Sequence, residues 1–348
     1  MTKLKVGVIG VGGIAKTHMP GWDESPYTEV IASSDIDSGI LNEWGNQYQI
    51  KKLYTDPYDL IADPNIDIVD ICTPNNYHCD LAIKSMEAGK HVLCEKPLAP
   101  KAKDIKKMIE ARDKTSKKLM CAQHFRFRET SKMIKKEAEN IGQIYHARSW
   151  MLRRNALPNR IGFLMKEHSG GGPCIDIGVH VLDLTLWFMG NPEPISVTGV
   201  SRTELAKEPG AFSKWGEYDS NIMDVEDFAS AFVRFNNGAV LILEVSWMLH
   251  HETDMEDMQI WLYGKNGGLH WPKCEKISSD NTNKTHLKTI LKTSNLEIEP
   301  HAKECIEFAD SVANEIPVPV PAEQSFQVMQ ILNGVYESQK TGKEVTLV

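Results

Sequence analysis

The sequence lacks the features that would mark several classes of protein. Its seven cysteines include no CxxC pair, which excludes zinc fingers and zinc ribbons and is typical of reduced thiols in a cytosolic protein. Basic residues are in the minority, and a net charge of −8 provides no basic surface for nucleic acid or an anionic membrane. The longest apolar run, "AVLILEVSWML", has 11 residues and contains Glu244, so it is too short to span a bilayer. We therefore expect a cytoplasmic protein that binds neither nucleic acid nor membrane.

The first third of the chain alternates short β-rich runs with helical segments. Such alternation is typical of βαβ units on a parallel sheet, and it stops near residue 123. We therefore predict a doubly wound α/β domain, of the Rossmann type, over residues 1–123. Its expected strands are residues 4–9, 29–34, 66–71, 91–97 ("HVLCEKP", halted by Pro97) and 119–122, and its expected helices are residues 37–48, 78–88 and 101–114, with a further helix after the first strand.

Beyond residue 123 the strand-like segments are longer and follow one another directly. The sequence "FNNGAV" between two of them is a hairpin signal, which favours antiparallel pairing. We therefore predict an α+β domain over residues 124–348 with a large, mostly antiparallel open sheet. Its two closing helices are candidates to pack back on the first domain. The expected strands are residues 143–152, 194–201, 227–235, 239–249 and 257–263, and the closing helices are residues 302–313 and 322–339.

A glycine loop follows the first strand. The segment from Gly10 to Ala15, "GVGGIA", fits the pattern G-x-G-x-x-A, in which the first glycine makes a tight turn and the second lets the backbone approach a pyrophosphate. The next strand ends at Asp35, where a carboxylate would hold the adenosine ribose hydroxyls. A carboxylate repels a 2′-phosphate, and Ile36 supplies no cation to offset this. The pattern predicts a dinucleotide site that prefers NAD to NADP.

Polar residues also follow later strands of the same domain. Thr73, Pro74 and Asn75 end one strand, and Glu95 and Lys96 end another, at the carboxyl edge where open α/β sheets bind ligands. From the residues alone, Lys96 is equally well explained as a solvated charge or as a functional group. The predicted cofactor contacts are Gly10, Gly12, Gly13, Ile14, Asp35, Thr73, Pro74, Asn75, His78, Glu95, Lys96 and Gln123.

The segment "GGPCIDIGVHVLDLTLW" places three polar residues in an apolar run. Asp176, His180 and Asp183 are spaced by four and three residues, which predicts one face of a buried helix. Such a stripe is either a satisfied core network or the wall of a pocket. Asp and His at this spacing could also share a metal ion, but no third ligand is near, and neighbouring His250 and His251 point to opposite faces of a strand. We expect no metal.

Four motifs together resemble the Gfo/Idh/MocA oxidoreductases, relatives of glucose–fructose oxidoreductase and inositol dehydrogenase. They are "GVIGVGGIA", "DICTPNNYH", "HVLCEKPLA" and "SGGGPCIDIGVHVLDLTLWFMG". The resemblance covers almost the whole chain. It implies a Rossmann domain, a nicotinamide cofactor and a second domain whose open sheet forms contacts between subunits. It also implies that Lys96, Asp176 and His180 are catalytic and that the Lys96–Pro97 bond is cis.

The chemistry implied by this resemblance is the NAD-dependent, reversible oxidation of a secondary ring hydroxyl of a neutral sugar or glycoside to a keto-sugar. His180, with an ordinary pKa of ~6.5, would take the hydroxyl proton. Lys96 would donate a hydrogen bond to the same oxygen, and Asp176 would orient the base. Asp183 either orients His180 from behind or belongs to a buried polar patch.

Substrate contacts are expected from loops beyond the Rossmann domain. Arg126 is expected to pair with the catalytic acids, and Gln123 to lie near the nicotinamide. Arg153 and Arg154 end a strand, and Phe163 and His168 follow in a loop. Alternation along a strand makes one of the two arginines a surface charge. The paired arginines resemble those of relatives acting on sugars, and two cations are too few for a phosphorylated sugar.

Three other activities remain open at this point. They are an inositol 2-dehydrogenase, a glycoside hydrolase that retains its NAD, and a non-catalytic sensor of NAD or sugar. The exposed face of the large sheet, with Trp247 and Trp261 nearby, needs a cover, so we expect a homodimer or homotetramer.

Overall fold

The computed structural model describes residues 3–293 and 298–347. The chain forms two compact units, one of Met1–Phe127 with Ile298–Phe326 and the other of Arg128–Glu297 with Gln327–Val348. Each unit is described by itself, as the first unit and the second unit. The domain boundary expected between residues 123 and 124 stays a prediction, and its outer ends at residues 1 and 348 lie outside the described residues.

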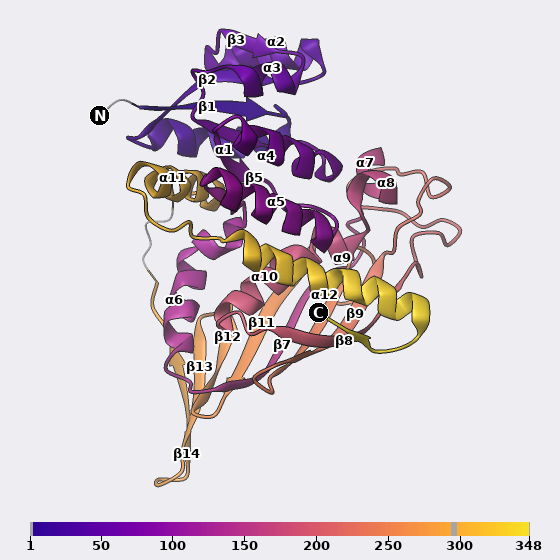
Figure 1. Ribbon diagram of the computed structural model, residues 1–348. Coiled ribbons are helices and arrows are strands. Elements are labelled where there is room, and N and C mark those ends of the chain that lie inside the picture. Colours follow the sequence, from indigo (N-terminus) through magenta and orange to yellow (C-terminus); the bar gives the residue numbers. More distant parts are fainter. Residues whose placement is uncertain (1–2, 294–297, 348) are drawn as a thin grey trace. The chain divides into compact units, whose positions relative to one another are not determined.

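The first unit is built on a six-stranded parallel sheet with the order β3-β2-β1-β4-β5-β6 (Figure 1). This is the doubly wound order, in which successive strands are added on one side of β1 and then on the other. The carboxyl ends of β1 and β4 therefore flank the switch point. The strands are β1 (Leu4–Ile9), β2 (Thr28–Ser34), β3 (Lys52–Tyr54), β4 (Ile68–Ile71), β5 (His91–Cys94) and β6 (Leu119–Cys121).

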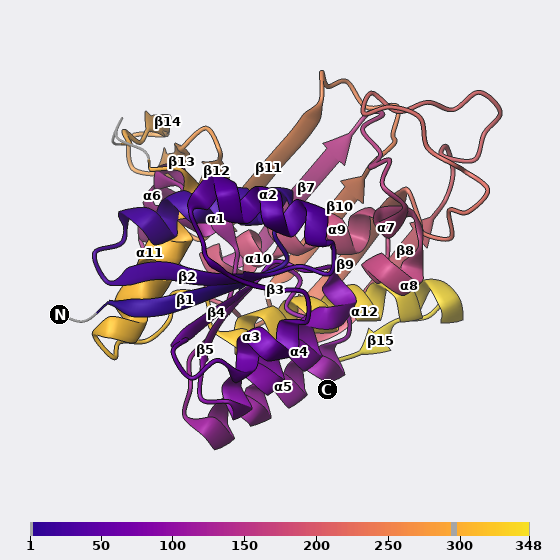
Figure 2. The ribbon, with the colours of Figure 1, turned by 90° about the horizontal axis from the view of Figure 1, so that it is seen from above.

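Helices cover both faces of this sheet. Figure 2 shows α1 and α2 on one face and α3, α4 and α5 on the other, and α11 packs against α1. The bounds are α1 (Gly13–Glu24), α2 (Ser38–Tyr48), α3 (Pro57–Ala62), η1 (Asn75–Tyr77), α4 (His78–Glu87), α5 (Ala102–Thr115), η2 (His124–Phe127) and α11 (Pro300–Ala313). The predicted elements are all present. In the described part of this unit, β3, α3, η1 and η2 were not predicted, because segments of three to six residues are too short to establish a period.

The second unit is built on a nine-stranded sheet with the order β14-β13-β12-β11-β7-β10-β9-β8-β15. All its neighbours pair antiparallel except β7 and β10, which are parallel. The strands are β7 (Ile144–Arg153), β8 (Pro194–Arg202), β9 (Phe228–Phe235), β10 (Val240–Ser246), β11 (Glu256–Gly264), β12 (Gly267–Trp271), β13 (Glu275–Asp280), β14 (Thr285–Ile290) and β15 (Val345–Thr346). The fold class predicted from the sequence is confirmed, including the "FNNGAV" hairpin between β9 and β10.

Helices α6 and α10 pack on this sheet, α10 against β7, β10 and β11. The bounds of the remaining helices are α6 (Glu129–Ala138), α7 (Ile161–Leu164), α8 (Lys166–Ser169), α9 (Pro173–Asp176), α10 (Gly178–Phe188) and α12 (Ala322–Thr341). The single helix expected over the Asp176 segment is wrong. Ile177, with φ −110° and ψ −25°, separates α9 from α10, so Asp176 ends one helix and His180 lies in the first turn of the next. Across the described residues, no helix combines the length and apolarity needed to cross a membrane.

Candidate active site

The glycine loop between β1 and α1 has the geometry expected of a phosphate cradle. Gly10 has φ +85°, and a Cβ there would lie 2.7 Å from the carbonyl oxygen of Cys72, so only glycine fits. Gly12 and Gly13 face open space, with nothing within 4 Å of an added Cβ. Helix α1 then begins without a side-chain cap or an acidic residue in its first turn. Its N-terminal N–H groups are therefore available to an anion.

Asp35 stands at the end of β2 beside this loop. Its Oδ2 accepts a hydrogen bond from the backbone N–H of Val11 at 3.0 Å, and its Oδ1 accepts one from Asp37 at 2.9 Å. These bonds fix the carboxylate next to the glycine turn. The neighbouring Ile36 is 88% exposed and carries no charge, so it offers no partner for a 2′-phosphate.

Several buried polar atoms near the strand ends have no hydrogen-bond partner among the described residues. They are Ser34 Oγ, Thr73 Oγ1 and both amide atoms of Gln123. Buried polar atoms are nearly always satisfied, so such a group indicates atoms that a ligand would supply. Thr73 and Gln123 were predicted from the sequence. Ser34 was not, because a serine at the end of a strand carries no signal of its own.

The cofactor contact predicted for His78 stays a prediction, and the structure shows how its ring is held. Its ring is fully buried, and its two nitrogens lie 2.8 Å from the carbonyl oxygens of Pro97 and Thr73. His78 thereby connects the segment after β4 to the segment after β5, and so holds two of the predicted ligand loops in register.

Lys96 is half-buried directly after β5. The Lys96–Pro97 bond is cis, as the family resemblance implies, and the Lys96 main-chain N–H donates to Glu95 Oε2 at 3.0 Å. Arg126, also predicted as a site residue, is buried and donates from Nη1 to Gln324 Oε1 at 2.5 Å. The expected pairing of Arg126 with the catalytic acids stays a prediction.

In the second unit, Asp176 is placed by the side chains of Arg153, at the end of β7, and Trp247, directly after β10. Its Oδ2 accepts a hydrogen bond from Trp247 Nε1 at 3.1 Å and lies 3.9 Å from Arg153 Nη1. Trp247 is fully buried, which corrects the expectation that it belongs to an exposed face of the sheet. His180 and Asp183 are buried as well, with exposed fractions of 7% and 1%.

The two arginines at the end of β7 have different environments. Arg153 is 9% exposed and donates from Nε to Glu256 at 2.7 Å, whereas the Arg154 side chain is 53% exposed. Arg154 is the surface charge that strand alternation predicts. The Nη1 of Arg153 is buried without a hydrogen-bond partner in the described parts of the chain. Among the other candidates, Phe163 is half-buried and His168 is exposed beside Glu167.

A residue that the sequence did not single out completes this group. The guanidinium of Arg153 lies 4.7 Å from the ring centroid of Trp215, which is 41% exposed and belongs to the long loop between β8 and β9. An indole with an accessible surface beside paired charges is suited to contact a sugar ring. Its only sequence signal is an aromatic residue in a polar loop.

Three consecutive glycines, residues 170–172, precede α9, and two of them let the backbone lie very close to neighbouring groups. A Cβ on Gly171 would lie 2.0 Å from Tyr336 Oη, and one on Gly172 would lie 2.0 Å from the carbonyl oxygen of Glu226. The carboxylate of Glu226 accepts hydrogen bonds from Tyr336 Oη at 2.8 Å and from the Cys174 N–H at 3.0 Å. The triplet therefore lets the chain that leads to Asp176 lie directly on Glu226 and Tyr336.

The chain is similar over most of its length to several known dehydrogenases. A D-glucoside 3-dehydrogenase of Escherichia coli is 29% identical over 99% of this chain and 97% of its own. A myo-inositol 2-dehydrogenase of Thermotoga maritima is 28% identical over 81% of this chain and 77% of its own. A solved structure of levoglucosan dehydrogenase in complex with NADH and L-sorbose has a TM-score of 0.85 at 25% identity, covering 100% of both chains.

Two family models match most of the sequence. Residues 4–123 match the oxidoreductase family with an NAD-binding Rossmann fold, and residues 133–347 match the C-terminal alpha/beta domain of the same family. On these matches, and on the glycine loop, the strand order and the placement of Asp35 described above, the chain belongs to the Gfo/Idh/MocA family of oxidoreductases.

Proposed function

We propose that this protein is an NAD-dependent dehydrogenase that oxidises a secondary ring hydroxyl of a neutral sugar or glycoside to a keto-sugar. The similarity to a D-glucoside 3-dehydrogenase over nearly the full length of both chains supports this substrate class. The reaction is reversible, so the same residues serve the reduction of a keto-sugar.

The observation that carries the proposal is the environment of Arg153. Its Nη1 is buried without a hydrogen-bond partner among the described residues, 3.9 Å from an Asp176 carboxylate oxygen. Its guanidinium lies 4.7 Å from the partly exposed Trp215 ring. A donor, an acceptor and an aromatic surface in one place match a ring that carries several neutral hydroxyls. A phosphorylated substrate would instead require several cations.

Residues of the first unit suit NAD. Gly10, Gly12 and Gly13 with the start of α1 would hold the pyrophosphate, Asp35 the ribose hydroxyls, and Thr73, Ser34 and Gln123 would find partners for their buried polar atoms. Asp35 and the uncharged Ile36 favour NAD over NADP. When bound, NAD accepts a hydride from the carbon that carries the reacting hydroxyl.

We assign the proton chemistry to three residues by the family resemblance. His180 takes the proton of the substrate hydroxyl as its general base. Lys96 donates a hydrogen bond to the same oxygen and stabilises its developing negative charge. Asp176 orients the base, and the hydrogen bond from Trp247 fixes one of its two oxygens.

The test is the absorbance change at 340 nm with NAD at neutral to mildly alkaline pH. Glucose, methyl glucosides, disaccharides, xylose, and myo- and scyllo-inositol form the substrate panel, with NADP in parallel. A rise with glucose or a glucoside supports the proposal. A rise with the inositols alone replaces it by the second candidate, which the similarity to a myo-inositol 2-dehydrogenase favours.

Matched variants separate catalysis from folding. Lys96→Ala and His180→Ala should each lower kcat by at least about a hundredfold, the usual range for a general acid–base group. Lys101→Ala and His250→Ala remove the same kinds of group from exposed positions, and they should leave turnover unchanged. Full activity in His180→Ala would instead favour a sensor. If no panel member is oxidised and the bound NAD does not exchange with free NAD, the result would favour a hydrolase that retains its cofactor.

Two further features belong to the same proposal. We propose a cytoplasmic location, and assembly into a homodimer or homotetramer through the open face of the nine-stranded sheet. On β11 and its neighbours, the half-buried ring of Trp261 stacks on His270 at 4.0 Å, and Tyr263 stacks on His146 at 5.2 Å. A second subunit would bury these rings.

A further inference from the structure

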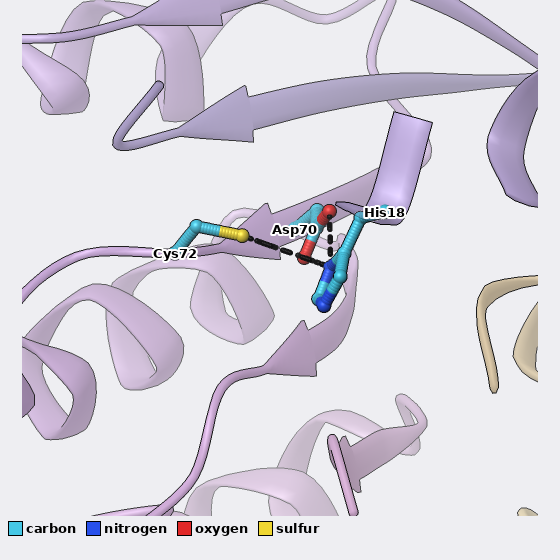
Figure 3. A group of neighbouring side chains, drawn as sticks. All are labelled: His18, Asp70 and Cys72. Carbon is cyan, nitrogen blue, oxygen red and sulfur yellow. Dashed lines mark hydrogen bonds and ion pairs between the residues drawn. The ribbon is translucent and has the colours of Figure 1, made fainter. Parts of the chain in front are cut away.

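A buried ionic cluster lies beneath the carboxyl ends of β4 and β5 in the first unit (Figure 3). At its centre is His18 of α1, which is fully buried. Its Nδ1 lies 3.0 Å and 3.2 Å from the two carboxylate oxygens of Asp70 on β4, and its Nε2 lies 3.1 Å from Glu95 Oε1 after β5. Asp70 accepts a further hydrogen bond from Trp22 Nε1 at 2.8 Å.

The geometry fixes the charge of this histidine. A neutral imidazole has one nitrogen without a proton, and that nitrogen would face a carboxylate oxygen at about 3 Å. With an ionised carboxylate on each side, both nitrogens donate, which is the arrangement of an imidazolium. Burial alone would lower the pKa of His18, but the attraction of neighbouring groups, Asp70 among them, raises it well above its ordinary value.

A third carboxyl group reaches the same ring without sharing in its hydrogen bonds. Glu304 of α11 is fully buried, and its Oε1 lies 3.6 Å from His18 Nε2, beyond hydrogen-bond distance. Burial raises the pKa of Glu304 well above its ordinary value. The groups around His18 are Asp70, Cys72, Glu95, His301, Glu304 and Cys305.

The residue types would also suit a metal ion, with either His18, Asp70 and Cys72 or His18, Glu95 and Glu304 as ligands. Either site requires a neutral imidazole, and the first also requires a thiolate. Here both ring nitrogens lie at hydrogen-bond distance from carboxylates, and burial raises the pKa of Cys72 well above its ordinary value. The observations therefore favour a protonated network, and a bound metal is an outcome that the test can reveal.

The cluster is connected to Lys96 through Glu95. One carboxylate oxygen of Glu95 faces His18, and the other accepts the Lys96 main-chain N–H at 3.0 Å. Burial would raise the pKa of Glu95, but its hydrogen bond with His18 and the charges of His18 and Lys96 keep it lowered. A carboxylate paired with a cation is a strong acceptor, so it holds the backbone at Lys96.

The helix that carries His18 is held closely in turn. A Cβ on Gly21 of α1 would lie 2.2 Å from the carbonyl oxygen of Ala302 on α11, so α1 and α11 are in backbone contact. The position of the His18 ring is therefore set both by the packing of α1 against α11 and by the carboxylates that the ring contacts.

We propose that His18 is a positioning residue for Lys96, acting through Glu95, whose charged carboxylate holds the Lys96 backbone only while His18 is paired with it. This inference rests on the proposed function for its catalytic consequence. Its structural part stands on the contacts of the first unit alone, and the two parts are tested by separate measurements.

The charge state is measured on the unmodified protein. Solid-state ¹⁵N NMR of histidine-labelled protein should show His18 with both nitrogens protonated at neutral pH, assigned by the signal lost in His18→Gln. A neutral ring overturns the inference. A shift typical of a metal-bound nitrogen, together with a metal found by elemental analysis, overturns it in favour of a metal site.

The positioning role is measured in His18→Gln with His91→Gln as the matched control. His91 lies at the other end of β5, where its Nδ1 accepts a hydrogen bond that glutamine can also accept. In His18→Gln, hydrogen exchange should show faster exchange of the Lys96 amide by about tenfold or more, the equivalent of losing a hydrogen bond to a charged group. If the protection of the Lys96 amide is unchanged in His18→Gln, the proposal is overturned. This measurement does not require the substrate to be known.

Kinetics then tests the consequence. In His18→Gln, kcat should fall by about ten- to hundredfold while the KM for NAD is retained. The acid limb of the kcat–pH profile should move to higher pH, since a buried Glu95 without its cation takes up a proton more readily. A fall in stability with an unmoved pH profile would reduce His18 to a structural role and overturn the proposal. An inactive wild type with protonated His18 and a protected Lys96 amide would overturn the proposed function instead.

Discussion

Replacing Gly172 by alanine tests how the proposed active-site segment of the second unit is held. Gly172 precedes α9, and its carbonyl accepts the N–H of Asp176 at 2.9 Å. A Cβ at Gly172 would lie 2.0 Å from the carbonyl oxygen of Glu226, where 3.4 Å is the beginning of ordinary contact. Two backbone segments would have to separate by about 1.4 Å, the difference between these distances.

The expected loss follows from this overlap. Overpacking in a closely packed interior lowers the free energy of unfolding by about 1–3 kcal/mol, and the backbone oxygen of Glu226 has no rotamer by which to withdraw. For a unit of this size, that corresponds to a midpoint lower by about 2–12 °C. The same shift displaces Asp176, so activity should fall as well.

Gly178→Ala is the matched control. An added Cβ there would lie 3.4 Å from the nearest atom, the carbonyl oxygen of Pro173, and Gly178 begins α10. Alanine is favoured over glycine in helices by up to about 1 kcal/mol, so this variant should keep or slightly raise the midpoint. Both are measured by circular dichroism during heating at one scan rate. Equal midpoints for the two variants would refute the steric argument.

Three further substitutions follow from the geometry. Asp35→Ser removes the charge that repels a 2′-phosphate. The ratio of kcat/KM for NAD to kcat/KM for NADP should therefore fall by about tenfold. An unchanged ratio would contradict the role of Asp35 at the ribose. Trp215→Ala should raise the KM for the sugar about tenfold with a smaller effect on kcat, whereas Phe212→Ala, on the same loop and 67% exposed, should not. The hydrogen bond from Lys52 lowers the pKa of Asp63, so Asp63→Asn should lower the urea midpoint at pH 7. That difference should shrink as the pH falls below about 4, where an unfolded aspartate is protonated and the lowered pKa of the folded state is approached.

Much of the first unit could be predicted because its signals are local. The glycine loop, the strand that follows it and Asp35 lie within a short stretch whose spacing has one well-known structural solution. The helices and strands of the parallel sheet also have hydrophobic periods that can be counted along the chain. For the same reason the antiparallel hairpin at "FNNGAV" was predicted correctly.

Predictions from the sequence were wrong where contacts between distant parts of the chain decided the local structure. The spacing of Asp176 and His180 is compatible with one helix, but the backbone changes conformation at Ile177 and divides it in two. Trp247 directly follows β10, whose residues largely alternate in burial, and the sequence could not decide which face was covered. Its indole donates to Asp176, a residue 71 positions away. The cofactor contact predicted for His78 stays a prediction, and the structure adds that both its nitrogens face backbone carbonyl oxygens.

The sequence by itself therefore determined the fold class, the family and the segments that carry the proposed chemistry, because each of these depends on residues close together along the chain. Only the tertiary structure decided which polar groups meet. His18 is separated from Asp70 by 52 positions and from Glu95 by 77, and no periodicity relates them. Their contact depends on how α1, β4 and β5 pack, and burial then makes the pairing of their charges obligatory, since an unpaired charge in the interior is too unfavourable to persist.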